Sequence, residues 1–261
     1  MSLLAVEGLA KTFRNASRTV AALDGVSLTL EAGETLALIG ASGSGKSTLA
    51  RAVLRLIEPD AGSIRFEGID LRALRGAPLR RLRARLQIVF QDAYAAFNPR
   101  ATVGRAIEDP LRIHGIVPAG ERPRHAAALL GRVGLPADLA GRNVHEISGG
   151  QRQRVAIARA IATNPQLVVL DEAVSALDVS VRAKVLQLLA DLQRERNIAY
   201  LFVSHDLAVV RRIAHRVAVM DKGRIVEIAS PEDLIRAPRS EAARALVAAV
   251  PRLKYRPDPP R

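Results

Sequence analysis

One run of nine residues constrains this chain more than any other feature. Residues 40–48 read GASGSGKST, which matches the pattern G-x-x-x-x-G-K-[ST] of a phosphate-binding loop. An apolar run, residues 35–39, precedes it and a helical pattern over residues 47–56 follows it, so the helix N-terminus faces the anion. This strand–loop–helix order predicts a nucleoside triphosphate site, and the alternative is a glycine-rich turn that binds nothing.

Each residue type in the loop has a chemical reason to be there. Glycines let backbone N–H groups converge on phosphates, Lys46 neutralises their charge, and the Ser47 hydroxyl can ligate Mg²⁺. We therefore expect ATP and Mg²⁺ as ligands and assign nucleotide binding to Gly40, Ser42, Gly43, Ser44, Gly45, Lys46, Ser47 and Thr48.

Two features of composition limit the class of protein. The 261 residues are 49% hydrophobic and include no cysteine, which excludes disulfide frameworks and thiolate metal sites. The first residues lack a basic segment followed by an apolar core, and no uncharged stretch approaches the roughly 18 residues that a membrane span needs. We expect a cytosolic protein that serves any membrane process by docking onto a separate membrane domain.

A formal net charge of +13 raises the question of a nucleic-acid partner. Aromatic residues make up only 3% of the chain, which leaves few rings to stack on bases, and the arginines are scattered. We therefore expect no nucleic-acid partner. The densest arginine segment, residues 72–85, is either a solvated helix face or a contact with anionic lipid headgroups.

The hydrophobic pattern along the chain alternates between short strands and helices. Strands are predicted at residues 3–6, 26–30, 63–68, 86–90, 167–170 and 199–203, with a closing hairpin at 216–220 and 225–228. From residue 92 to about 155 the pattern is helical and punctuated by prolines. We interpret this helical segment as a second lobe.

Polar residues follow two of the predicted core strands. Asp171 and Glu172 end the run at residues 167–170, and His205 follows the run at residues 199–203. Beside a phosphate loop, Asp171 can reach Mg²⁺ and Glu172 can polarise the attacking water, because neighbouring strand residues point to different sides. His205 can contact the γ-phosphate. The alternative for the acidic pair is a cap of the next helix.

A second glycine-rich run, Ser148, Gly149, Gly150 and Gln151, stands directly before a helical pattern. A hydroxyl, N–H groups and a positive helix end here suit a second anion contact. The alternative is a helix cap within a monomeric ATPase.

Taken in order, these motifs resemble the nucleotide-binding cassette of ABC transporters over nearly the whole chain. The S-G-G-Q run between the phosphate loop and the acidic strand is the most specific of them. The resemblance implies that Gln91 senses Mg²⁺ and the membrane partner, that Ser148 to Gln151 form the signature, that Asp178 is the dimer-loop aspartate and that His205 is the switch histidine. Phe13 stands where the family places an adenine-stacking aromatic, although it could be an ordinary core phenylalanine.

The resemblance also implies an architecture. We expect an α/β fold of the P-loop NTPase (RecA-like) type, with an antiparallel β subdomain and an inserted α-helical subdomain. Residues 1–91 and 156–230 would form the core and the β subdomain, 92–155 the helical signature subdomain, and 231–261 a C-terminal tail. Two cassettes would pair head to tail, so that each ATP lies between one phosphate loop and the opposite signature.

Further runs narrow the branch of the family. Residues 89–100, VFQDAYAAFNPR, and the stretch from Ala237 onward resemble the ATPases of peptide and nickel importers, although the tail cysteines of some members are absent. We predict an ATP-hydrolysing importer subunit, peripheral on the cytoplasmic face of the cell membrane. Its expected partners are permease subunits, a second cassette that is a homologous subunit or another copy, and indirectly a solute-binding protein. The alternatives are an exporter subunit and a soluble ABC ATPase acting on nucleic acid.

Overall fold

The computed structural model describes residues 2–15, 18–92, 96–175 and 177–249. Three stretches used in the sequence interpretation lie outside this part: residues 93–95 of the run that follows Gln91, Ala176 in the run that ends at Asp178, and residues 250–261 of the predicted tail. Within the described ranges, no helix combines the length and the apolar character needed to cross a membrane.

A sheet of six strands, within the described residues, forms the centre of the molecule, in the order β10-β9-β3-β8-β7-β6. The neighbouring strands from β9 to β6 are parallel, and β10 is antiparallel to β9. Every residue of β3, β7 and β8 is buried, as continuous apolar strands between two layers must be. The strands are β3 (Thr35–Ile39), β6 (Leu86–Val89), β7 (Leu167–Asp171), β8 (Ala199–Val203), β9 (Arg216–Asp221) and β10 (Arg224–Ala229).

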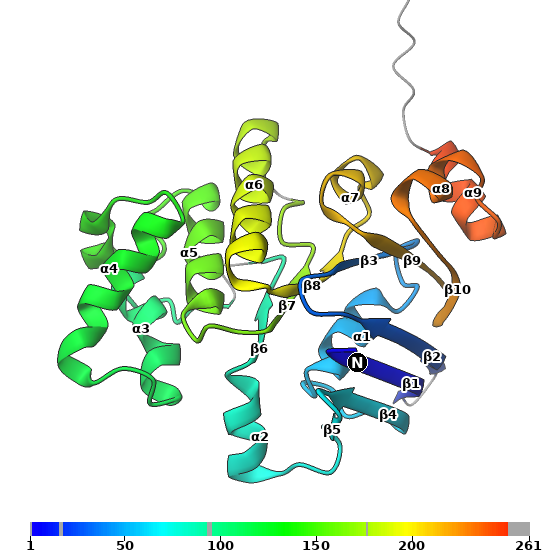
Figure 1. Cartoon of the computed structure of the whole chain (residues 1–261), viewed down its shortest axis with the longest axis horizontal. Helices are drawn as coiled ribbons and strands as arrows, with labels where there is room; N and C mark the ends of the chain where they lie inside the picture. Colours follow the sequence, from blue (N-terminus) through cyan, green and yellow to red (C-terminus); the bar gives the residue numbers. More distant parts are fainter. Residues whose placement is uncertain (1, 16–17, 93–95, 176, 250–261) are drawn as a thin grey trace, which may run out of the picture.

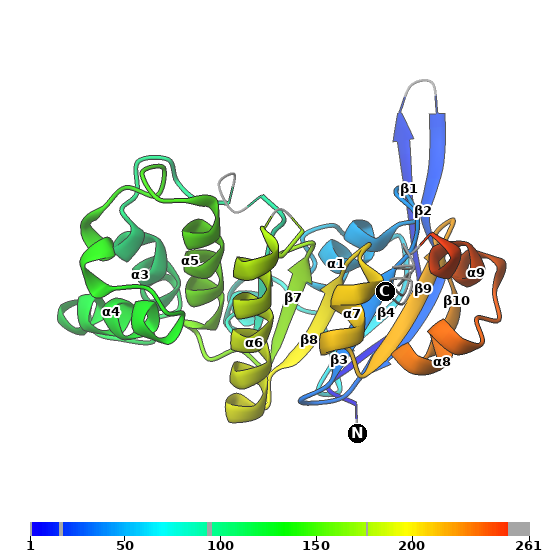
Figure 2. The same ribbon diagram turned by 90° about the horizontal axis from the view of Figure 1, so that it is seen from above.

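A second, antiparallel sheet has the order β2-β1-β4-β5. Its strands are β1 (Leu4–Asn15), β2 (Arg18–Leu30), β4 (Ala61–Phe66) and β5 (Ile69–Asp70). The predicted strands at residues 3–6 and 26–30 are only the inner ends of a longer β1–β2 hairpin, which projects from the body of the molecule (Figure 2). Its outer part was missed because it carries many exposed residues and so lacks a core pattern.

The helical segment packs at one end of the molecule, while the last two helices lie at the other (Figure 1). The first group shares a core of fully buried residues such as Val103, Leu130 and Val155. It contains α3 (Val103–Ile113), η1 (Ala119–Glu121), α4 (Arg122–Arg132), η2 (Ala137–Gly141) and α5 (Gly149–Ile161). Because α5 continues past residue 155, the division of the chain into subdomains stays a proposal.

The remaining helices flank the sheets. Helix α1 (Lys46–Val53) follows the phosphate loop, and α2 (Gly76–Arg83) precedes β6. Helices α6 (Val179–Arg196) and α7 (Leu207–Ile213) connect β7, β8 and β9. Helices α8 (Pro231–Arg236) and α9 (Glu241–Ala248) follow β10, and residues of both, Leu234 and Ala243, share a buried cluster with β3 and β9.

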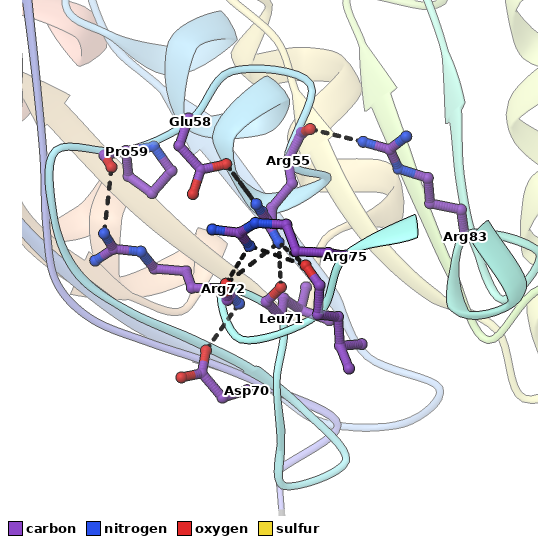
Figure 3. A network of polar contacts seen from close by, with 9 residues as sticks. Arg55, Glu58, Pro59, Asp70, Leu71, Arg72, Arg75 and Arg83 are labelled. Carbon is purple, nitrogen blue, oxygen red and sulfur yellow. Dashed lines mark hydrogen bonds and ion pairs between the residues drawn. The ribbon is translucent and has the colours of Figure 1, made fainter. Parts of the chain in front are cut away.

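Three arginines of the arginine-rich segment, Arg72, Arg75 and Arg83, donate to main-chain carbonyls (Figure 3). The centre of this network is Arg55, whose side chain is 5% exposed and donates to the carbonyls of Leu71 at 2.6 Å and Leu74 at 2.7 Å. Arg83 in turn donates to the carbonyl of Arg55 at 2.7 Å. Arg72 and Arg75 also donate to carbonyl oxygens. These guanidinium groups therefore fix the connection between β5 and α2 against the end of α1.

Candidate functional site

The phosphate loop connects the buried end of β3 to the start of α1 and borders a cavity of about 430 Å³. Apart from Ser44, which is 4% exposed, every loop residue assigned to nucleotide binding lines this cavity. The rest of the lining comes from other segments: Val20, Ala22, Glu172 and His205. The fold thus brings the loop, the acidic strand and the predicted switch histidine to one place.

Two glycines of the loop are required by close contacts. Gly40 has φ +155°, and a Cβ there would lie 2.2 Å from the carbonyl oxygen of Met220. Gly45 has φ +105°, and its Cβ would lie 2.3 Å from the carbonyl oxygen of Ala22. Both approaches are too short for any side chain, so only glycine fits at these two positions. There the backbones of β2 and of the end of β9 pack against the loop.

Lys46 lies at the start of α1 and is 7% exposed. Its Nζ donates to the carbonyls of Gly40 at 2.9 Å and Ala41 at 2.8 Å, which holds the ammonium group across the loop. Burial lowers the pKa of Lys46, while the nearby carboxylates of Glu172 and Asp171 oppose this shift. A phosphate group in the cavity would meet this cation directly.

Asp171 is the last residue of β7 and is 3% exposed. The Ser47 hydroxyl donates to its Oδ1 at 3.0 Å, which places two oxygen ligands side by side. Burial raises the pKa of Asp171, and the hydrogen bond from Ser47 opposes this shift. Among the described residues, no group of three His, Cys, Asp or Glu could hold a metal. A site in which the protein supplies only two hard oxygen donors fits Mg²⁺, because this ion takes its other ligands from water and phosphate.

Glu172 lies at the centre of the three residues predicted to be catalytic. Its Oε2 accepts a hydrogen bond from Nε2 of Gln91 at 3.0 Å and lies 3.4 Å from Nδ1 of His205. The backbone of Glu172 has φ +50°, a left-handed conformation that few non-glycine residues adopt. Its N–H donates to the carbonyl of Val203 at the end of β8. The carboxylate is thus aimed from the end of the parallel sheet toward the phosphate loop.

The predicted signature lies on a different surface. Ser148 caps α5 by accepting from the N–H of Gln151 at 3.3 Å, and the Gln151 side chain accepts from the N–H of Ser148 at 2.9 Å. Gly149 and Gly150 form the first turn of α5. In the described part of the chain, none of these four residues lines the cavity of the phosphate loop. The structure therefore separates two motifs that both suit an anion.

Asp178 lies near the signature. It caps α6 by accepting from the N–H of Val181 at 2.9 Å, and it also accepts from the hydroxyl of Ser180. These two hydrogen bonds lower the pKa of Asp178. A Cβ on Gly150 would lie 3.0 Å from Cγ1 of Val181, so the first turns of α5 and α6 are in contact. The neighbouring Val179 is 81% exposed. The starts of α5 and α6 therefore present glycine, serine and an uncovered valine on one exposed region.

Phe13 is 42% exposed, which excludes the alternative of an ordinary core phenylalanine. It pairs across the hairpin with Val20, which lines the cavity, and directly opposed residues share one face of a sheet. Lys11 Nζ lies 5.7 Å from the ring centroid. The ring is therefore placed beside the cavity, and its stacking on adenine stays a proposal.

Several residues that shape the site were missed by the sequence interpretation. Val20 and Ala22 come from β2, and Met220 from the end of β9. Arg51 lies near Asp171 and lines, with Gln91 and Ser47, an adjoining cavity of about 320 Å³. No local motif marks Val20, Ala22 or Met220, because long-range pairing of strands brings them to the loop, and Arg51 on α1 lies outside the phosphate-loop pattern.

Comparison with known proteins agrees with this geometry. The model of the ABC transporter family matches residues 23–175. The glutathione import ATP-binding protein GsiA of Pectobacterium atrosepticum is 52% identical over 90% of this chain, which spans only 38% of that relative's length. A putative peptide import ATP-binding protein of Brucella ovis is 49% identical over 98% of this chain and 80% of its own length.

Solved structures give the same result. A dimeric post-hydrolysis state of the ATP-binding cassette MJ0796, bound to ADP and Pi, matches with a TM-score of 0.80 and 30% identity over 87% of this chain and 98% of that one. A second dimeric structure of MJ0796 matches with a TM-score of 0.79. The predicted fold class and the resemblance are thus confirmed, and the chain belongs to the ABC transporter family of ATP-binding proteins.

Proposed function

We propose that this chain is the ATP-hydrolysing subunit of an ABC importer that moves peptides. The observation that carries the proposal is the convergence of Gln91 and His205 on Oε2 of Glu172, beside the cavity of the phosphate loop. The relatives are named as glutathione import and putative peptide import ATP-binding proteins, and these names support an importer over an exporter. Nickel stays an alternative cargo, but the relatives named above do not support it.

The chain's own residues can carry out the hydrolysis. Lys46 neutralises the phosphates, and Ser47 and Asp171 are placed to hold Mg²⁺ together with Gln91. When bound, Mg²⁺ neutralises charge on the phosphate oxygens. Glu172 accepts the proton of the attacking water, and His205, whose Nδ1 lies 3.4 Å from Oε2 of Glu172, contacts the γ-phosphate. The phosphate-loop N–H groups and Phe13 position the nucleotide.

The separation of the signature from the phosphate loop supports a shared site. Ser148, Gly149, Gly150 and Gln151 start α5 on another surface, where they can contact a nucleotide held by a second cassette. Asp178, at the adjoining start of α6, would lie at the same contact. ATP would then stabilise a head-to-tail pair by linkage, and hydrolysis would remove the γ-phosphate contacts that hold it closed.

The partners follow from this role. We propose docking onto permease subunits at the cytoplasmic face of the cell membrane, with a solute-binding protein engaged indirectly. The second cassette is a homologous subunit or another copy of this chain. A soluble ABC ATPase that acts on nucleic acid is the rival function, which the low aromatic content of 3% argues against despite the net charge of +13.

Affinity purification of the tagged protein at moderate salt separates these functions. Retention of permease subunits in detergent, with no DNA or RNA after nuclease-free washing, is the expected result. Stable retention of nucleic acid alone would support the rival, because a specific nucleic-acid contact survives salt that removes scattered arginine contacts.

A further inference from the structure

The turn between β9 and β10 touches the phosphate loop through its backbone. The N–H of Gly223 donates to the carbonyl of Ser44 at 3.0 Å. On the other side of the turn, the N–H of Asp24 on β2 donates to the carbonyl of Gly223 at 2.9 Å. Gly223 is therefore a bridge between a strand of the antiparallel sheet and the middle of the loop.

Close packing reinforces this bridge. An ideal Cβ on Gly40 would lie 2.2 Å from the carbonyl oxygen of Met220. An ideal Cβ on Gly45 would lie 3.3 Å from Cε of Met220 and 3.5 Å from Cα of Gly223. Met220 is fully buried. With so little space between the backbones, a displacement of the turn must displace the loop.

The hydrogen bond to Ser44 has a direct consequence for the cavity. In a trans peptide unit the carbonyl and the following N–H point in opposite directions. When Gly223 holds the carbonyl of Ser44, it also fixes the N–H of Gly45, which points away from the turn. Gly45 lines the cavity, so this orientation is part of the arrangement of donors that a phosphate would meet.

We infer that Gly223 is a positioning residue for nucleotide binding, acting through the Ser44–Gly45 peptide unit without touching the nucleotide. The inference rests on the proposed nucleotide site. It assigns a binding role to a turn that follows the last parallel strand and carries no recognised motif. The neighbouring Lys222 has φ +45° and Gly223 has φ +81°, so the turn has a tight, left-handed conformation.

The chain contains a matched control for this turn. Glu67 and Gly68, between β4 and β5, have φ +48° and +76°, nearly the same conformation. A Cβ on Gly68 would meet no atom within 4 Å, whereas one on Gly223 would lie 3.0 Å from the carbonyl oxygen of Ala22. Gly68→Ala therefore introduces the same backbone strain as Gly223→Ala without moving a neighbour.

The test compares ATP affinity and thermal stability of the wild-type protein, Gly223→Ala and Gly68→Ala. Both variants should lose stability, but only Gly223→Ala should bind ATP about fivefold to tenfold more weakly in calorimetry, as expected when a hydrogen bond in the site is displaced. Hydrogen exchange should also become faster at residues 40–46 in Gly223→Ala alone. Equal affinity in Gly223→Ala and the wild type, or equal weakening in both variants, would overturn the inference.

A second pair of variants keeps the test decisive if Gly223→Ala fails to fold. Arg224→Ala removes an exposed ion pair, with Nη2 of Arg224 2.7 Å from Oδ2 of Asp24, that joins the turn to β2. Arg112→Ala removes an exposed ion pair within α3, with Nη2 of Arg112 2.9 Å from Oδ1 of Asp109. Only Arg224→Ala should weaken ATP binding, by about twofold, and equal affinity in the two would refute the inference. Failure of the wild-type protein to bind ATP would instead refute the proposed function.

Discussion

Replacement of Glu172 by glutamine tests the centre of the proposed site. The substitution keeps the size of the side chain and an oxygen that can accept from Gln91, which lies 3.0 Å away. It removes the carboxylate that we propose takes the proton of the attacking water. A positioned general base contributes about 10²- to 10⁴-fold to a rate, which is about 3 to 5 kcal/mol of activation free energy. Steady-state hydrolysis should fall by that factor.

Binding should respond in the opposite direction. Since Glu172 lines the cavity, loss of its negative charge removes a repulsion toward phosphate oxygens, so Glu172→Gln should bind ATP at least as tightly as the wild type. The trapped nucleotide should then favour the paired form. Phosphate release measures the rate, and size-exclusion chromatography with ATP, alone and with candidate partner cassettes, measures the pairing.

Glu67→Gln is the matched control for this prediction. Glu67 has φ +48°, close to the +50° of Glu172, and its carboxylate also accepts hydrogen bonds, from Arg85 and Gln166. Because Glu67 lies at the β4–β5 turn, the Glu67→Gln variant should hydrolyse ATP at the wild-type rate. Undiminished hydrolysis by Glu172→Gln would refute the general-base role. If ATP-bound Glu172→Gln stays monomeric, alone and with every candidate cassette, the shared site is refuted.

Three further predictions concern neighbouring residues. Lys46→Ala should weaken ATP binding at least about tenfold by calorimetry, because a buried phosphate contact is lost; an unchanged affinity would contradict this. Ser148→Ala and Thr102→Ala each remove a cap oxygen that accepts at 3.3 Å and should each lose about 1 kcal/mol of unfolding free energy, yet only Ser148→Ala should impair ATP-driven pairing in chromatography. Burial raises the pKa of Asp171, so its stabilisation relative to the unfolded chain is present below the ordinary pKa and is lost as pH rises through the raised value. Asp171→Asn should therefore raise the free energy of urea unfolding more at pH 8 than at pH 4, and an equal change at both would refute this.

The parallel core could be predicted because its strands are continuous apolar runs. Strands β3, β7 and β8 are buried along their whole length, and the polar residues at or just after the ends of β7 and β8 meet at the carboxyl edge of the sheet. Asp171, Glu172 and His205 could therefore be grouped with the phosphate loop before any coordinates were known. The contacts of Glu172 with Gln91 and His205 agree with that grouping.

The supports of the site could not be predicted in this way. The outer part of the β1–β2 hairpin is exposed and lacks a core pattern, so the pairing of Phe13 with Val20 was not foreseen. The bond between Gly223 and Ser44 joins distant segments and uses only backbone atoms, which no side-chain pattern encodes. Arg55 was not singled out, because its importance comes from the carbonyls of Leu71 and Leu74 that surround it.

The reciprocal caps of Ser148 and Gln151 have a consequence for the reversibility of assembly. An isolated molecule already satisfies the N–H groups of Ser148 and Gln151 internally, so a bound phosphate would gain from these two donors only the small difference between the old and the new hydrogen bonds. Contacts that start from a satisfied surface add little net affinity apiece. A proposed head-to-tail pair joined through such contacts would separate readily once ATP is cleaved, as an ATPase that must reset after every turnover requires.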